Sequence, residues 1–215
     1  PIIEDNIVEL AETFTANLAI APGTPLVTRG TDTTDAGVGT ITDNDLATFT
    51  INSVSVAENA GTLDFTLSLS NPIDTAADVN VSFADVTTGA GDFTHTTQTI
   101  SFGVLDIADK MVSVPIIDDN IVELAETFTA SLAIAPGTPL VTRGNDLAGA
   151  GTGTITNDDT AIISFKTVPS EDELHMGQTS GFDFVIQIDK EIDVAVTIDV
   201  DTMNGEATLA DIDYV

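Results

Sequence analysis

The sequence predicts an all-β protein built from tandem antiparallel β-sandwich modules. Three observations predict this class: short runs that alternate apolar and polar residues, turn-forming residues between the runs, and an internal repeat as long as a domain. Thr, Val, Ile and Phe dominate the runs, while Gly, Asn, Asp and Pro separate them. About seven such strands in some 114 residues are typical of an immunoglobulin-like sandwich.

Alternation with a period of two residues places the individual strands. In chain order, it predicts strands at residues 48–56, 62–69, 79–83, 98–102, 111–117 and 127–134. The pattern is clearest in the second run, whose apolar face would hold Leu63, Phe65, Leu67 and Leu69. Residues 121–126 fit helical spacing as well. We predict a short turn there, with a short helix as the alternative.

An internal repeat sets the organisation of the chain. Residues 1–30 match residues 115–144 at all but two positions, and GTITDND at 39–45 corresponds to GTITNDD at 153–159 with the same offset of 114 residues. A period of this length is the size of a whole domain, not of a solenoid repeat.

The repeat divides the chain into three predicted modules: the end of a first module, a complete central module and the start of a third, at residues 1–45, 46–159 and 160–215. We expect them to be cut from a longer array and truncated at both ends. No Gly/Ser-rich or Pro-rich linker separates them, and acidic triplets stand at the seams. The joints should therefore be stiffened by whatever these acids bind.

Composition excludes several classes of function. The chain has 35 acidic and 5 basic residues, a formal charge of −30, which disfavours nucleic acids and anionic lipid surfaces as partners. No apolar run approaches the roughly 18–20 residues that cross a bilayer, so we expect no direct membrane insertion. Hydrophobic residues make up 42%, enough for a packed core. The lack of Cys excludes disulfides, Cys-ligated zinc and thiol catalysis.

The acids of the central module cluster at predicted strand ends and loops. They fall in residues 118–126 and 157–159, with Glu58 and Asp92 as isolated members. Two carboxylates about 4 Å apart repel by roughly 4 kcal/mol at an effective dielectric near 20. A hard divalent cation relieves this repulsion, and Ca²⁺ accepts carboxylates and carbonyls together. The alternative is that these acids are ordinary turn residues.

The order of these motifs resembles the Calx-beta domain, known from sodium–calcium exchangers, an integrin and large bacterial surface proteins. The motifs are VAE at 56–58, GDF at 91–93, DDNIVELAETF at 118–128 and TITNDD at 154–159. The resemblance implies a Ca²⁺-binding sandwich. Asn157 stands where the family often has an acid.

The resemblance also implies the calcium ligands. For the central module they are Glu58, Asp92, Asp118, Asp119, Ile121 through its carbonyl, Glu123, Glu126, Asp158 and Asp159. For the first module they are Glu4, Asp5, Ile7, Glu9, Glu12, Asp43 and Asp45. That site should be incomplete, because the counterparts of Glu58 and Asp92 lie upstream of residue 1. In the third module, Asp213 corresponds to Asp92.

These observations predict a calcium-binding structural repeat of a large secreted or cell-surface adhesin, matrix or filament protein, with Ca²⁺ rigidifying the module junctions. Expected partners are neighbouring modules of the same chain, with other copies or a surface ligand as further candidates. The alternatives are a regulatory calcium-sensing module of a membrane transporter or receptor, and a spacer of an extracellular hydrolase. The chain has no P-loop, G-x-S-x-G or H-E-x-x-H motif, and we do not expect an enzyme.

Overall fold

The computed structural model describes residues 1–18, 22, 36–135, 141–143, 150–172, 174–175 and 178–207. The chain forms two compact units: residues 1–119 with 125–158, and residues 120–124 with 159–215. Within the described ranges, no helix is long and apolar enough to cross a membrane.

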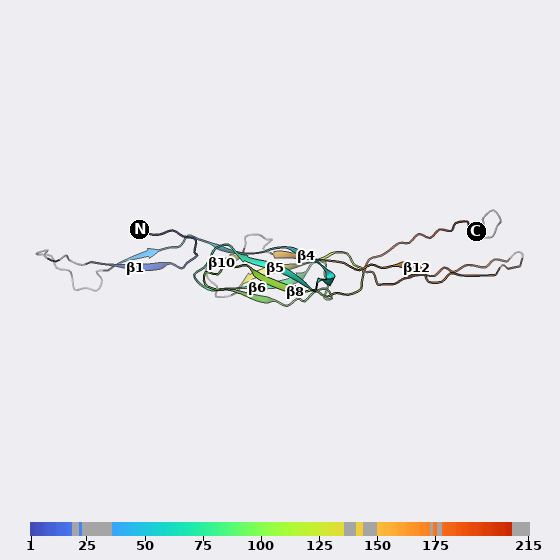
Figure 1. Cartoon of the computed structure of the whole chain (residues 1–215). Helices are drawn as coiled ribbons and strands as arrows, with labels where there is room; N and C mark the ends of the chain where they lie inside the picture. Colours follow the sequence, from blue (N-terminus) through green and yellow to red (C-terminus); the bar gives the residue numbers. More distant parts are fainter. Residues whose placement is uncertain are drawn as a thin grey trace. The chain divides into compact units, whose positions relative to one another are not determined.

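Two sheets packed face to face form the central module (Figure 1). The first sheet has the order β10-β3-β5-β8, with β3 at Ala47–Ile51, β5 at Thr62–Leu69, β8 at Lys110–Pro115 and β10 at Val141–Arg143. The second has the order β4-β11-β9-β6-β7, with β4 at Val54–Ala57, β6 at Ala77–Asp85, β7 at Gln98–Phe102, β9 at Glu126–Ile134 and β11 at Ala150–Thr156. A single 3-10 turn, η1 at Glu58–Ala60, follows β4.

The alternation in the sequence becomes the core of this sandwich. Every second residue of β5 is buried, from Leu63 to Leu69, as the pattern predicts. The aromatic rings meet between the sheets: Phe65 of β5 lies edge-on to Phe128 of β9, with ring centroids 5.9 Å apart. The predicted strands at 62–69, 79–83, 98–102, 111–117 and 127–134 correspond to β5 to β9. The all-β sandwich is therefore confirmed.

Most strand pairs of this sandwich are antiparallel, as predicted, and two are parallel. Strand β10 pairs in parallel with β3, and β11 pairs in parallel with β4. The cause is a break in the predicted strand 48–56. There the amide of Asn52 donates to the Thr66 carbonyl (3.2 Å), and its side chain accepts the Thr66 N–H (2.7 Å). The strand thereby leaves the first sheet at Asn52 and enters the second as β4.

The segment 121–126 contains no helix. Residues 121–125 form an irregular loop whose Val122 makes an isolated bridge, and β9 begins at Glu126. This agrees with the predicted turn that leads into a strand.

The first module repeats a part of the central sandwich. Strands β1 at Glu12–Asn17 and β2 at Ala36–Ile41 pair in the register that places Phe14 opposite Gly39. The nearly identical sequence in the central module places Phe128 opposite Gly153. Phe14 is 55% exposed, whereas Phe128 is fully buried, because only the second hairpin is covered by another sheet. In the second unit, β12 at Ile163–Phe165 pairs with β13 at Ile186–Ile188.

Candidate metal centre

The register of the strands brings the acidic segments of the central module to one end of the sandwich. The start of β5 lies opposite the end of β8, where Thr62 pairs with Pro115. The start of β9 lies opposite the end of β11, and β4 and β11 end side by side. Five predicted ligands lie close to these strand ends: Glu58 follows β4, Asp118 and Asp119 come shortly after β8, Glu126 begins β9, and Asp158 comes shortly after β11.

The segment that follows β8 holds the site together. The amide of Ile116 donates to the Gly61 carbonyl (3.0 Å), and the amide of Ile117 donates to the Asp92 carbonyl (2.9 Å). Two residues later, the Asp119 amide donates to Glu58 Oε1 (3.2 Å). Glu58 and Asp92, which are far apart in sequence, are thereby held on either side of the segment that carries Asp118 and Asp119.

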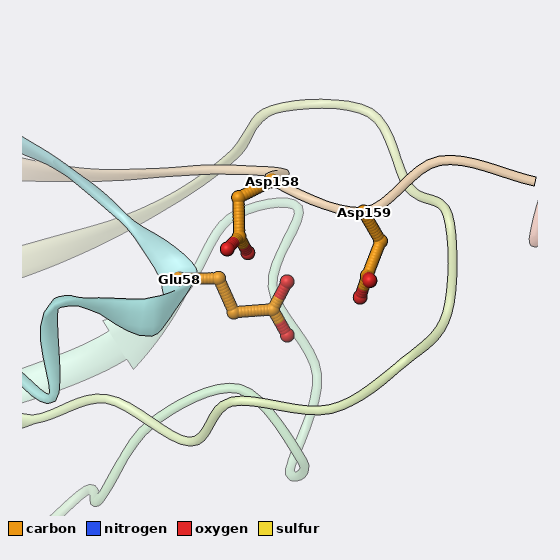
Figure 2. Close-up of side chains that lie close together, drawn as sticks. All are labelled: Glu58, Asp158 and Asp159. Atoms are coloured by element: carbon orange, nitrogen blue, oxygen red, sulfur yellow. The ribbon is translucent and has the colours of Figure 1, made fainter.

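Glu58 is the most unusual of these acids, because it is only 4% exposed. Its carboxylate oxygen, with those of Asp158 and Asp159, lies in a group whose atoms are all within 4.8 Å of one another. Figure 2 shows the three carboxylates turned toward one another. The Asn59 side-chain amide contacts Asp158 Oδ2 and fixes that side chain.

The electrostatics of Glu58 follow from this geometry. Burial is the first cause that raises the pKa of Glu58, and the negative charges of Asp119, Asp118 and Asp158 raise it further. The hydrogen bond from the Asp119 amide acts in the opposite direction, since it favours the ionised carboxylate. A cation beside these carboxylates would offset their repulsion and favour the ionised form of Glu58.

A second group of carboxylates contains Asp92, Glu123 and Glu126, whose oxygens also lie within 4.8 Å of one another. All three residues are half-buried. The Gly89 amide donates to Asp92 Oδ2, which orients that carboxylate within its loop. The sequence predicted nine ligands of the central module as one set, and the structure brings six of them together in two groups of three.

The acids of the first module surround one pocket. Its lining includes Glu4, Asp5, Glu9, Glu12, Asp43 and Asp45. Partial burial and the charges of Asp5 and Glu12 raise the pKa of Glu9, and partial burial and Asp43 raise that of Asp45. In contrast to the central module, no three of these described carboxylates lie within 4.8 Å of one another.

The remaining predicted ligands are placed as follows. Ile7 and Ile121 are both half-buried in their loops, and the Ile7 amide donates to Asp5 Oδ1 (2.9 Å). Asp118 is exposed and contributes to the site through its charge on Glu58. Asp213 lies outside the described residues. The assignment of all these residues as ligands stays a prediction.

Two charged residues near these acids were missed by sequence reasoning. Asp74 adds to the negative charges that raise the pKa of Glu9. Lys190 forms an ion pair with Asp159 within the second unit. Both stand in short segments that correspond between modules, NPID at 71–74 and KEID at 190–193. The shared Ile-Asp was the available signal, but the repeat is too weak there to draw attention to it.

The donors fit a hard cation. Every clustered side chain offers a carboxylate oxygen, and neither group contains a histidine. Ca²⁺ binds oxygen ligands at about 2.4 Å, so ligands on opposite sides of the ion lie about 4.8 Å apart. Each group is therefore compact enough for its three carboxylate oxygens to reach one such ion.

The fold and these donors define a β-sandwich domain with two groups of carboxylates at one end that could hold a metal ion. The family model of the Calx-beta domain matches residues 40–159, and the chain belongs to this family of calcium-binding domains. No curated protein matches the sequence.

Solved structures of Calx domains are similar to this chain. The apo form of the Calx CBD1 domain has 23% identity and a TM-score of 0.47, covering 54% of this chain and 100% of that one. CBD12 of CALX1.2 has 23% identity and a TM-score of 0.46, covering 55% and 49%. The calcium binding domain CBD12 of CALX1.1 has 25% identity and a TM-score of 0.45, covering 55% and 50%. The chain thus spans about half the length of the two CBD12 chains.

Proposed function

We propose that the chain is a calcium-binding structural repeat of a large secreted or cell-surface adhesin, matrix or filament protein. The observation that carries this proposal is the convergence of acids from four segments at the end of the central module, where the chain continues without a linker into residue 160. Calcium held there by Glu58, Asp158 and Asp159, and by Asp92, Glu123 and Glu126, would offset their repulsion. It would thereby stiffen the joint.

The near-identical repeat favours an array over a single sensor. Residues 1–30 and 115–144 differ at only two positions, although nothing in a signalling role requires two copies. Neighbouring modules would be the main partners, with other copies or a surface ligand as further ones. Family membership supports a second candidate equally well, a regulatory calcium-sensing module of a transporter or receptor. A spacer of an extracellular hydrolase is the third. In each case the role of this segment is binding, not catalysis.

A calcium titration followed by calorimetry and thermal melting tests the proposal. A ligand at 100 times its Kd stabilises the folded state by about 2.7 kcal/mol, so the melting temperature should rise clearly with Ca²⁺ and fall with EGTA. Mg²⁺ should act more weakly, because it keeps more of its water. Small-angle scattering should show a narrower range of module angles with Ca²⁺.

Matched variants assign the effect to the site. Asp119→Asn and Glu126→Gln remove one charge each and should weaken calcium binding by at least tenfold. Asp64→Asn removes an exposed charge from the face of β5 and should leave binding unchanged. An identical melt of the parent chain in Ca²⁺ and in EGTA would contradict the proposal.

A further inference from the structure

A residue of the first acidic loop is built into the central module. Val8 makes an isolated parallel bridge with Ile73, which follows β5. The Val8 amide donates to the Pro72 carbonyl (2.9 Å), and the Asp74 amide donates to the Val8 carbonyl (3.1 Å). The backbone of Val8 is thus held from both sides, as in a single rung of a sheet.

The side chain of Val8 is part of the hydrophobic core. Val8 is 1% exposed and Ile73 is fully buried, and both belong to the core cluster of the sandwich. Its neighbours in the loop behave differently, since Ile3 is 87% and Leu10 is 52% exposed. The loop therefore inserts one apolar residue and leaves its acids outside.

The same backbone pairing recurs in the second unit, where Val122 and Ile192 are half-buried. Val122 is the counterpart of Val8 in the repeat, and it bridges Ile192 in parallel. Its amide donates to the Glu191 carbonyl (2.9 Å), and its carbonyl accepts the Asp193 amide (3.2 Å). Two separate copies of the acidic loop thus make the same pair of hydrogen bonds, each to its own Ile-Asp segment.

The receiving segments are positioned alike. The amide of Thr48 donates to Ser70 Oγ (3.0 Å), just before the NPID segment. In the second unit, the amide of Ile162 donates to Asp189 Oδ1 (2.6 Å), just before the KEID segment. Ile162 is the repeat counterpart of Thr48. In both copies, therefore, the residue just before the Ile-Asp segment accepts a hydrogen bond from the same backbone position.

We propose that the loop DNIVEL is a docking element that joins each module to the following copy, with the valine inserted against the Ile-Asp segment of that copy. The partner is therefore the next module of the same kind, recognised by one apolar side chain and two main-chain hydrogen bonds. Docking does not require a metal ion. It fixes the joint even where calcium is absent, and calcium bound by the neighbouring acids adds to a contact that already exists.

Hydrogen exchange of the whole chain in EGTA tests this inference independently of calcium. The amides of Val8, Asp74, Val122 and Asp193 should exchange at least tenfold more slowly than in an unstructured peptide. In Val8→Asp, protection of the Asp74 amide should fall at least tenfold, because the charge cannot enter the core. The amides of Val122 and Asp193 should keep their protection in this variant.

Leu10→Asp is the matched control, since it places the same charge on an exposed residue of the same loop and should leave the Asp74 amide protected. Val8→Ala is the milder second variant, with a smaller loss at Asp74 and unchanged protection in the β5–β8 ladder. Three outcomes would overturn the inference: unprotected bridge amides in the parent chain, Asp74 protection that survives Val8→Asp, or a uniform loss across the sandwich in Val8→Ala. A failure of calcium binding would leave these results untouched.

Discussion

Phe93 and Phe128 stack between the sheets with ring centroids 4.0 Å apart and planes 19° from parallel. Each ring stands beside a clustered acid in sequence: Phe93 follows Asp92, and Phe128 stands two residues after Glu126. The stack therefore connects the core to the candidate metal centre, because it fixes the backbone positions from which these two carboxylates extend.

Replacing one ring of this stack should weaken calcium binding. We expect Phe93→Leu to lower affinity by about tenfold or more, as loss of supporting contacts around metal ligands generally does. Phe102→Leu is the control, because Phe102 packs on Phe49 away from the acids. Both variants should lose thermal stability, and only the first should lose affinity in calorimetric titrations. Equal affinities in the two variants would show that the stack does not position the acids.

The metal-free protein should lose stability as pH rises above the ordinary range of glutamate. The pKa of Glu58 is raised by burial and nearby acids, so the folded state binds more protons than the unfolded state between the two pKa values. Stability is then greatest below the unfolded pKa and falls as pH rises through the folded one. Glu58→Gln should flatten this dependence in EGTA, measured by urea unfolding from pH 4 to pH 8.

The same substitution should act in the opposite direction with calcium present. At neutral pH, Glu58→Gln removes a repelling charge from the metal-free protein and should stabilise it. In saturating Ca²⁺ it removes a negative donor and should destabilise the protein relative to the parent chain. A change of the same sign in both buffers would argue against metal coordination by this residue.

Gly151→Ala should destabilise the central module. A Cβ at Gly151 would lie 2.2 Å from the Asn52 carbonyl oxygen. The backbone at Asn52 cannot move without disturbing the point at which the chain passes from the first sheet to the second. Such overpacking costs about 1–3 kcal/mol. Gly103→Ala is the control, since its Cβ would meet only Asp106 at 3.9 Å. Chemical denaturation in EGTA compares the two, and equal midpoints would contradict the close approach.

The two copies of the hairpin should respond unequally to the same change. Phe128→Ala removes a fully buried ring and should cost about 3–5 kcal/mol of unfolding free energy. Phe14→Ala changes the identical local sequence where the ring is 55% exposed, and should cost much less. Urea unfolding of both variants gives the comparison. Comparable losses would mean that the first hairpin is covered in solution.

Lys190 should weaken calcium binding at the residue it pairs with. Its ammonium group neutralises part of the charge of Asp159, whereas the first junction has Asn71 at the corresponding position. Lys190→Asn should therefore raise calcium affinity by a few-fold, in keeping with the modest strength of partly exposed ion pairs. Lys166→Asn, an exposed lysine of the same unit, is the control. If calorimetry finds the same calcium affinity in both variants, Lys190 does not compete with Ca²⁺ for Asp159.

The sequence by itself determined the local features of this protein. Period-two alternation gave the core positions of β5 and β9, because the side chains of a strand must alternate between solvent and the facing sheet. The placement of acids at strand ends predicted the candidate metal centre, and the long repeat predicted the division into modules. The tight packing at Gly151 and Gly153 has no local signal in the sequence, since their close neighbours Asn52 and Phe128 are distant in sequence.

The tertiary structure alone decided which distant residues meet. It moved the strand from one sheet to the other at Asn52, which produced two parallel pairs. It divided the acids into two groups, and it inserted Val8 against Ile73. In the sequence, Val8 is one apolar residue among several in an acidic loop. Its burial follows from a pairing with a segment far along the chain, and no local pattern encodes such a pairing.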